Sequence, residues 1–419
     1  MRKGISGILA TSLAAFALGT ALAGPAQAEE LTGNLRIFFN DLNPAPRSAI
    51  EGLVARFQEK HPGLEIELTV LDREANKTQI RNYLTANPPD VNAWYAGNRM
   101  RPFVAAGLFE DVSDLWEGEL GEALASTRPS MTIDGRQWGV PYTYYQWGLY
   151  YRSDIFDRLG LTAATTWEEE LENCRTLLEN GIKCYTIGTR FLWTAAGWFD
   201  YLSLRTHGYE FHMALTNGEI PWTDERVREV FANWRTLVDM GAFVDNHTSF
   251  TWQEALPFLV NGEAGAYLMG NFAVAPLRDA GLTDDQLGFA QFPLITAGIP
   301  MAEDAPTDTF HIPAGAQNKE AARAFLRFVV DPENQTIINE ELGQLPVHRD
   351  ARVGDDKFLQ AGFEMLSNAS ALAQFFDRDA PAEMASAAME GFQEFMVRPD
   401  NLDAILTRLE RVRERVYRE

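Results

Sequence analysis

The sequence predicts an α/β protein of two domains, and three observations lead to this fold class. The chain has 419 residues, more than a single hydrophobic core usually holds. Stretches that alternate apolar and polar residues are interleaved with segments of helical spacing, as in an α/β sheet. No low-complexity stretch or long flexible linker divides the chain, so we expect several segments, not one tether, to connect the domains.

The first 28 residues are expected to be a secretory signal peptide. Arg2 and Lys3 give a basic start, residues 5–23 form an apolar run, and Ala26-Gln27-Ala28 is a small-residue site for signal peptidase. The alternative is a membrane anchor, since the run is only just long enough to span a bilayer. The Gly24-Pro25 break favours cleavage, which would leave 391 of the 419 residues as a soluble protein in the periplasm.

The charge of the chain excludes one class of partner. The formal net charge is −23, and loss of the two basic residues of the signal makes it −25. Binding to a phosphate backbone requires basic surface that displaces counterions, so we expect no nucleic acid partner. An anionic membrane surface would repel such a body as well.

The mature chain opens with a strand–helix–strand unit. Residues 35–39 form the first predicted strand, and helical spacing of apolar residues follows over 50–57. His61-Pro62-Gly63 ends this helix, and residues 64–70 alternate as a second strand. This unit is the local signature of an α/β sheet.

The later elements continue the alternation. In chain order we expect a helix that ends at 87–89, a strand at 90–95, a helix at 103–108, a hairpin turn at 133–136, an aromatic extended stretch at 139–151, a helix that starts at the Thr166–Glu169 capping box and ends near 181, a helix at 227–238 and a C-terminal helix at 402–416.

The two cysteines, Cys174 and Cys184, are expected to form a structural disulfide. An exported protein enters an oxidising compartment, where such a pair tends to bridge. Their ten-residue offset fits neither a C-x-x-C redox motif nor a zinc site. Free thiols are the alternative.

Catalytic signatures are scarce in the sequence. It contains no G-x-S-x-G elbow, phosphate loop or G-x-G-x-x-G motif, and its six histidines are scattered without metal-ligand spacing. We therefore expect no cofactor, no metal and no catalytic residues. Acidic residues are abundant, so composition alone does not exclude a glycosidase pair, but Glu168–Glu170 lies where it would favour a helix dipole.

Aromatic residues gather in particular segments, above all in the run Tyr142–Trp147. Core filling is the default interpretation of any single ring. The whole run cannot enter one core, because an extended segment sends alternate side chains to opposite faces. A sugar presents an apolar C–H face to a ring and a polar rim to hydrogen-bonding groups, so this composition favours a carbohydrate site.

Eight segments in order resemble motifs of one family: 57–68, 88–91, 106–112, 134–156, 166–169, 262–270, 312–322 and 343–347. Together they resemble family 1 of the extracellular solute-binding proteins, the maltose-binding-protein-like carbohydrate receptors of ATP-driven importers. Two departures stand out. Residues 163–167 lack the family's prolines, and Phe272 stands where a Trp is usual.

The resemblance implies a type II periplasmic binding protein, with two α/β lobes hinged around a cleft. Lobe one would comprise 29–142 and 274–308, and lobe two 143–273 and 309–419. Crossing segments would lie near 142–146, 270–273 and 309–313. The implied partners are a small carbohydrate and an inner-membrane ABC permease, and the implied state is a monomer.

Ligand contacts are expected at strand ends and crossings, where open α/β sheets bind. The candidates are Asn40, Asp41, Trp94, Tyr95 and Asn98 from lobe one, Tyr144, Gln146 and Trp147 at the first crossing, Trp193 and Trp198 from lobe two, Asn271 and Phe272 at the second crossing, and Arg349 after the 343–347 turn. Trp252 is expected to cap a helix. Phe375 and Phe376 lie where relatives often place a stacking ring.

Two other functions remain open at this point. One is a secreted glycoside-active enzyme. The other is a receptor of the same fold for an anionic solute, such as a glycerol phosphate ester or a sulfonated sugar. Arg99, Arg101 or Arg349 in the cleft would favour the anionic solute.

Overall fold

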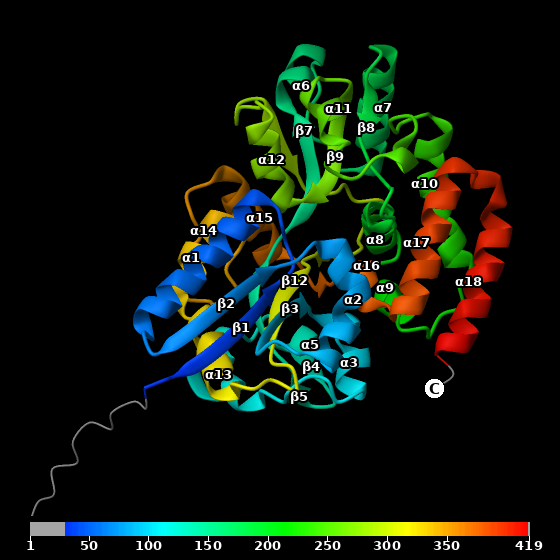
Figure 1. Cartoon of the computed structure of the whole chain (residues 1–419). Helices are drawn as coiled ribbons and strands as arrows, with labels where there is room; N and C mark the ends of the chain where they lie inside the picture. The colour runs from blue at the N-terminus through cyan, green and yellow to red at the C-terminus, as the bar shows by residue number, and fades with distance from the viewer. Residues whose placement is uncertain (1–29, 418–419) are drawn as a thin grey trace, which may run out of the picture.

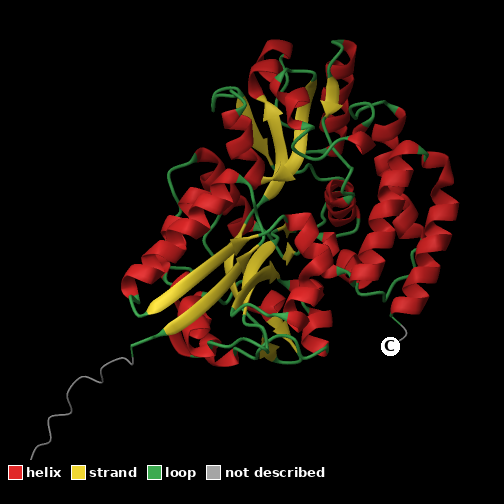
Figure 2. Ribbon diagram, in the orientation of Figure 1, coloured by secondary structure: helices red, strands yellow, loops and turns green. Residues whose placement is uncertain are grey.

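The computed structural model describes residues 30–417, which form two lobes (Figure 1). The expected signal peptide at 1–28 lies outside the described residues. Figure 2 shows two separate groups of strands, each with helices packed around it. Within residues 30–417 no helix is both long and apolar enough to cross a membrane.

Lobe one is built on a five-stranded sheet with the order β2-β1-β3-β12-β6. Its strands are β1 (Gly33–Phe39), β2 (Leu64–Val70), β3 (Val91–Tyr95), β6 (Val140–Tyr144) and β12 (Thr307–His311). The first three strands are parallel, as the opening strand–helix–strand unit predicts, while β12 runs antiparallel between β3 and β6.

Helices surround this sheet and bury its apolar side chains in one core. They are α1 (Pro44–Lys60), α2 (Arg73–Ala86), α3 (Arg101–Ala105), α4 (Gly118–Ala123), α5 (Arg128–Met131), α13 (Lys319–Val329) and α14 (Pro332–Leu342), with short turns η1 (Gly97–Arg99) and η2 (Ser113–Trp116) and a small hairpin of β4 (Thr132–Ile133) and β5 (Arg136–Gln137). The core joins Leu35, Ile37 and Leu53 to Phe310 and Phe325.

Lobe two is built on a four-stranded sheet with the order β10-β7-β9-β8. Its strands are β7 (Trp147–Arg152), β8 (Lys183–Tyr185), β9 (Ala264–Gly270) and β10 (Leu287–Ala290). Here β7 is antiparallel to both of its neighbours, and only β8 and β9 are parallel.

Most of the remaining helices surround the second sheet. They are α6 (Ser153–Leu159), α7 (Trp167–Glu179), α8 (Trp193–Thr206), α9 (Tyr209–Thr216), α10 (Glu225–Asp239), α11 (Leu256–Val260), α12 (Val274–Asp279), α15 (Lys357–Asn368), α16 (Phe376–Asp379), α17 (Ala382–Val397) and α18 (Leu402–Val416), with turns η3 (His247–Ser249), η4 (Asn271–Ala273) and η5 (Pro399–Asn401). α17 and α18 form an antiparallel pair beside α10 (Figure 1).

Within the described residues the chain passes between the lobes three times: at 145–146, over 291–306 and over 343–356. The second passage contains β11 (Glu303–Asp304), which pairs with β13 (Leu372–Ala373). The first passage lies where the sequence suggests one. The expected crossings at 270–273 and 309–313 are wrong, because the former stays in lobe two and the latter begins inside the sheet of lobe one.

The expected lobe boundaries need the same correction. Residues 274–290 were expected in lobe one, yet α12 packs into the core of lobe two and β10 pairs with β7. Residues 309–342 were expected in lobe two, yet β12, α13 and α14 belong to the core of lobe one. The cause is strand pairing, since β12 completes the first sheet by joining β3 to β6.

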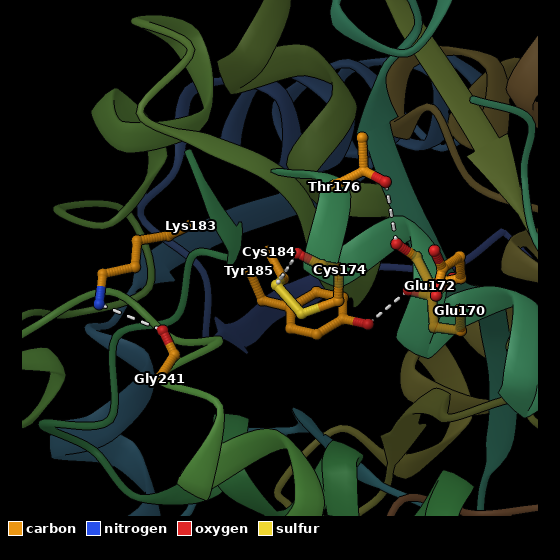
Figure 3. Close-up of a disulfide and its surroundings, with 8 residues drawn as sticks. All are labelled: Glu170, Glu172, Cys174, Thr176, Lys183, Cys184, Tyr185 and Gly241. Atoms are coloured by element: carbon orange, nitrogen blue, oxygen red, sulfur yellow. Dashed lines mark hydrogen bonds between the residues drawn. A yellow bond between two sulfur atoms is a disulfide. The ribbon is translucent and has the colours of Figure 1, made fainter. Parts of the chain in front are cut away.

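Cys174 and Cys184 form the expected disulfide, with Cα atoms 5.1 Å apart. Figure 3 shows that the bond joins the later part of α7 to β8. α7 begins at the expected capping box, in which the Thr166 hydroxyl accepts from the Glu169 amide and the Glu169 carboxylate accepts from the Thr166 amide. The bond therefore fixes a helix–strand turn at the edge of the second sheet.

Candidate functional site

A cleft between the lobes combines side chains from both sheets. Lobe one contributes the segment after β1 and the start of α2, while lobe two contributes the start of β7, the loop before α8 and the turn after β9. Its main lining residues are Asp41, Leu42, Asp72, Arg73, Glu74, Lys77, Tyr95, Tyr145, Trp147, Phe191, Trp193, Trp252, Phe272, Asp279, Phe375, Asp377 and Arg378. Strand ends thus supply much of the site, as the α/β fold predicts.

The wall from lobe one is charged and internally paired. Asp41 follows β1, Arg73 begins α2, and their Oδ2 and Nη2 atoms are 2.6 Å apart. Arg73 also lies 3.9 Å from the carboxylate of Asp308 on β12. Burial works to lower the pKa of Arg73, but Asp41, Tyr95 and Asp308 more than offset it and hold that pKa well above its ordinary value.

Arg378 of α16 connects the charged wall to Tyr145, which lies in the first passage between the lobes. Its guanidinium lies 2.9 Å from the Asp308 carboxylate, donates to the Thr307 carbonyl at 2.9 Å and donates to the Tyr145 hydroxyl at 3.1 Å. It also lies 4.4 Å from the centre of the Tyr95 ring, a cation–π distance. Burial raises the pKa of Tyr95 and of Tyr145, so both phenols remain neutral hydrogen-bonding groups at physiological pH.

α16 belongs by packing to lobe two yet reaches across to lobe one. Phe376 is fully buried in the core of lobe two, while the Asp377 carboxylate lies 3.8 Å from the Lys77 ammonium on α2. Each of the three cations in the cleft lining, Arg73, Lys77 and Arg378, therefore has a carboxylate within ion-pair distance.

The wall from lobe two is aromatic. Trp147 at the start of β7 contacts Phe375, with ring centres 4.6 Å apart, and meets Trp193 edge-on at 6.0 Å. Phe272 lies 6.2 Å from Trp193 and 5.2 Å from Trp252. Trp193 and Phe272 stay half-buried while Trp147 and Phe375 are buried, so the first two present the accessible ring surface.

Together, the aromatic wall and the charged wall present the groups that a sugar ligand requires. Rings cover the apolar C–H face of a pyranose, and carboxylates, amides and phenols satisfy its hydroxyl groups. Carboxylates that are already ion-paired retain lone pairs for hydroxyl donors. In the described residues, no group of three or more His, Cys, Asp or Glu is arranged to hold a metal ion.

Five of the thirteen residues expected at the site line the cleft: Asp41, Tyr95, Trp147, Trp193 and Phe272. Phe375, which was noted as a possible stacking ring, lines it as well. Whether they bind ligand remains a prediction.

Four expected residues instead hold the fold together. Trp94 is 2% exposed and donates to the Arg99 carbonyl, and Trp198 is fully buried against Tyr185 and Phe243. Gln146 donates to the Phe358 carbonyl at 2.8 Å. Asn271 accepts from the Tyr150 hydroxyl at 2.9 Å and donates to the Gly343 carbonyl. None of the four belongs to the cleft lining.

Four further candidates lie elsewhere. Asn40 is 3% exposed and outside the cleft lining. Asn98 and Tyr144 line a separate interlobe cavity, in which Asn98 donates to the Asp379 carbonyl. The side chain of Arg349 is 57% exposed near Glu122 and does not belong to the cleft lining.

Several lining residues escape the sequence analysis. Arg73 follows β2 just as Asp41 follows β1, so the rule that found Asp41 could have found it. Trp252 was expected to cap a helix, but its ring packs against Phe272 in the aromatic wall. No sequence signal marked Asp377 or Arg378, because α16 is a four-residue helix without periodicity.

Comparison with known proteins identifies the family. The family model described as bacterial extracellular solute-binding protein matches residues 42–336. An ABC transporter extracellular-binding protein from Pyrococcus horikoshii is 25% identical over 313 residues, covering 73% of this chain and 69% of the relative. A second such protein from the same organism is 23% identical over 383 residues, covering 87% and 85%.

Solved structures share the fold. The bacterial solute receptor AcbH, described as having an exclusive preference for β-D-galactopyranose, superposes with a TM-score of 0.85 at 24% identity, covering 92% of this chain and all of that one. A chitin oligosaccharide binding protein superposes with a TM-score of 0.84 at 19% identity, covering 93% and 100%. The two-lobed architecture and a family match over most of its length show that this chain belongs to the bacterial extracellular solute-binding proteins, a family of receptors.

Proposed function

We propose that the protein is a periplasmic, monomeric receptor that binds a sugar or sugar derivative in the interlobe cleft. It delivers this ligand to the permease of an ABC transporter. The observation that carries the proposal is the pairing of an aromatic wall from lobe two with a hydrogen-bonding wall from lobe one. The sugar ligands named for AcbH and for the chitin oligosaccharide binding protein support the same class.

The cleft favours a neutral ligand over an anion. Five lining residues, Asp41, Asp72, Glu74, Asp279 and Asp377, are acidic and three are basic, and each of the three basic groups already faces a carboxylate. An anionic solute would have to displace one of these carboxylates. Of the arginines expected to favour an anion, Arg349 lies on the surface and Arg101 lines the other cavity.

Binding would act through hinge closure. A ligand that touches both walls has its largest contact area when the lobes approach, so it shifts the population toward the closed form by its differential affinity for that form. The permease would then recognise the closed receptor.

A thermal-shift screen tests the proposal, followed by calorimetry on each hit. The probes are neutral sugars, each beside its uronic acid as a matched anionic control, together with glycerol phosphate and sulfonated sugars. A neutral sugar at 100 times its Kd should stabilise the protein by about 2.7 kcal/mol. Stabilisation by non-carbohydrates alone would overturn the ligand class. Release of chromophore from chromogenic glycosides, above that of a buffer blank, would contradict a receptor.

A further inference from the structure

Three fully buried titratable side chains lie beside the second passage between the lobes. Asp200 comes from α8, His212 from α9 and Asp304 from β11, and α8 contacts both α9 and β11. Each residue has 0% exposure, and each has a side-chain nitrogen or oxygen that lacks a hydrogen-bond partner while the carboxyl groups are ionised. Such atoms are rare in folded proteins, because a buried polar group that loses water and gains no partner is costly.

A proton between the two carboxyl groups would satisfy two of these atoms. Asp200 Oδ2 accepts from the Phe376 amide at 2.9 Å, which leaves Oδ1 without a donor, and neither oxygen of Asp304 has a donor. The two carboxyl groups lie within hydrogen-bond reach of each other. An ionised carboxylate can only accept, so a hydrogen bond between them requires that one of them carries a proton.

The basic groups that face this pair do not neutralise it. Arg205 on α8 faces Asp304, but its guanidinium pairs with Glu303 at 2.5 Å and donates to two backbone carbonyls. His212 Nε2 lies 3.8 Å from Asp200 Oδ1, but burial lowers the pKa of His212 to about 4, so the imidazole is neutral at physiological pH. Neither group supplies a counter-charge to the pair.

The other charged groups that face the pair are acidic. Asp379 and Asp377 of α16 face Asp200, while Asp379 and Glu303 face Asp304. Burial and the negative charge of these neighbours raise the pKa of both carboxyl groups well above its ordinary value. Two carboxyl groups at hydrogen-bond distance in a buried site do not both ionise, since like charges repel strongly there.

The pair joins the second passage to lobe two. The ion pair of Glu303 attaches the passage to α8, and so does the contact between Asp304 and Asp200. β12, in the sheet of lobe one, begins at Thr307, so only residues 305–306 separate this attachment from lobe one. The point at which the passage leaves lobe two is therefore set at Asp304.

We propose that Asp200 and Asp304 share one proton at neutral pH, and that this proton holds the second passage against α8. Asp304 is then a positioning residue for the connection between the lobes and makes no contact with ligand. Loss of the proton at alkaline pH would place two like charges in contact and weaken the attachment of the passage to α8. The inference goes beyond the proposed function, and it holds whichever ligand the cleft binds.

Infrared spectroscopy in D2O tests the shared proton, because a protonated carboxyl group has a carbonyl band that a carboxylate lacks. The natural protein is compared at neutral pH with Asp200→Asn, Asp304→Asn and the variant that carries both substitutions. The asparagine amide supplies a donor in place of the proton, so each single variant should lose one band, and the double variant should lose no more than either. Additive losses would mean two separate protons, and no loss would mean two ionised carboxylates. Each of these results would overturn the inference.

Asp379→Asn is the matched control, because that carboxyl group is buried beside the same pair and burial raises its pKa to about 8. Its band should disappear separately, and the loss should add to that of either single variant. A loss that does not add would place the proton of Asp379 in the same pair and overturn its assignment to Asp200 and Asp304.

Hydrogen exchange tests whether the proton positions the passage. The Glu303 and Ala305 amides donate to the carbonyls of Ala371 and Ala373 at 3.0 and 2.9 Å. Opening of the passage would release the proton, so the opening equilibrium measured at these amides should rise by up to about tenfold per pH unit above neutral pH. The rise is measured relative to Asp304→Asn at the same pH, because that variant has no shared proton to lose.

The Lys183 amide, which donates to the Glu263 carbonyl at 2.9 Å in lobe two, is the control and should exchange alike in both proteins. An equal pH dependence of the Glu303 and Ala305 amides in the two proteins would overturn the positioning role. Asp200→Asn removes the same proton from the other side of the pair, and it takes the place of Asp304→Asn if that variant does not fold.

Discussion

The two walls of the cleft are built from different chemistry. Lobe one presents charged groups that are paired with one another, from Asp41 through Arg73 to Asp308, and Arg378 on α16 of lobe two pairs with Asp308. Lobe two presents rings fixed by packing, with Trp147 in contact with both Trp193 and Phe375. One wall depends on electrostatic pairing and the other on apolar contact.

This difference predicts that substitutions in the two walls have different effects, one on the stability of the fold and the other on ligand affinity. Removing one member of a buried ion pair leaves its partner charged and unpaired in a low-dielectric site, which reduces the stability of the whole fold. Removing a half-exposed ring loses ligand contact area and little packing, so it reduces affinity. Substitutions in the two walls can therefore separate stability from binding.

Arg378→Met should have the largest effect and should act on stability. Arg378 and Asp308 are both about 5% exposed, and methionine would leave the Asp308 carboxylate without its closest cation. Loss of one partner of a buried pair costs about 3–5 kcal/mol, measured by urea denaturation. Arg349→Met is the control, since that exposed side chain should change stability by less than about 0.5 kcal/mol. Equal effects of the two substitutions would refute the distinction.

Trp193→Ala should act on binding. Its ring faces the cleft and remains half-buried, so alanine should cost roughly 2–4 kcal/mol of binding free energy with a smaller change in stability. Calorimetric titration measures the loss. Trp138→Ala is the control, because Trp138 is also half-buried but lies in lobe one and donates to the Ile133 carbonyl. An unaltered Kd in Trp193→Ala would show that the aromatic wall does not contact the ligand.

The disulfide belongs to the same hydrophobic core as Trp147 and Phe375, and it tests whether lobe two can be weakened without changing the site. Replacing both Cys174 and Cys184 with serine should reduce stability by about 2–3 kcal/mol through loop entropy. Neither residue lines the cleft, so the Kd should stay constant at a temperature where the variant is folded. A parallel loss of affinity would mean that the α7–β8 turn helps to position the rings.

Much of this architecture can be predicted from the sequence, but the sequence does not predict which side chains of a strand face the core and which face the cleft. The opening strand–helix–strand unit and the capping box at Thr166 are local patterns, and both are present in the structure. Trp94 and Tyr95 are adjacent on β3, yet the first enters the core and the second lines the cleft. Alternation along a strand predicts this split, but it does not say which residue of a pair faces which side.

The remaining errors come from contacts that are distant in the chain. β12 could be assigned to lobe one only by knowing that it pairs with β3, more than 200 residues earlier. Arg378 enters the site because α16 packs on the core of lobe two and extends toward Asp308. Neither fact leaves a periodic signal in the local sequence.

The buried carboxyl groups of Asp308 and Asp379 have different partners, and that of Asp379 predicts a pH dependence of the stability of the fold. Asp308 lies 2.9 Å from the Arg378 guanidinium, whereas Asp379 accepts one backbone hydrogen bond, from the Gln374 amide at 2.9 Å. Burial raises the pKa of Asp379 to about 8, against the opposing effects of that hydrogen bond and of Arg378. Asp379 is therefore protonated in the folded protein at neutral pH and ionised in the unfolded chain.

The sign of the resulting pH dependence follows from proton counting. Between the ordinary carboxyl pKa and about 8, the folded state holds a proton on Asp379 that the unfolded state has lost, so stability falls as pH rises.

Asp379→Asn keeps an acceptor for the Gln374 amide and cannot ionise. The difference in unfolding free energy, variant minus natural protein, should rise by about 1 kcal/mol per pH unit across this window and level off above it. Burial raises the pKa values of Asp200 and Asp304, and the charge of Asp379 raises them further, so the measured difference reports Asp379 together with its effect on these two carboxyl groups. A constant difference from pH 5 to pH 8 would mean that Asp379 is already ionised in the fold.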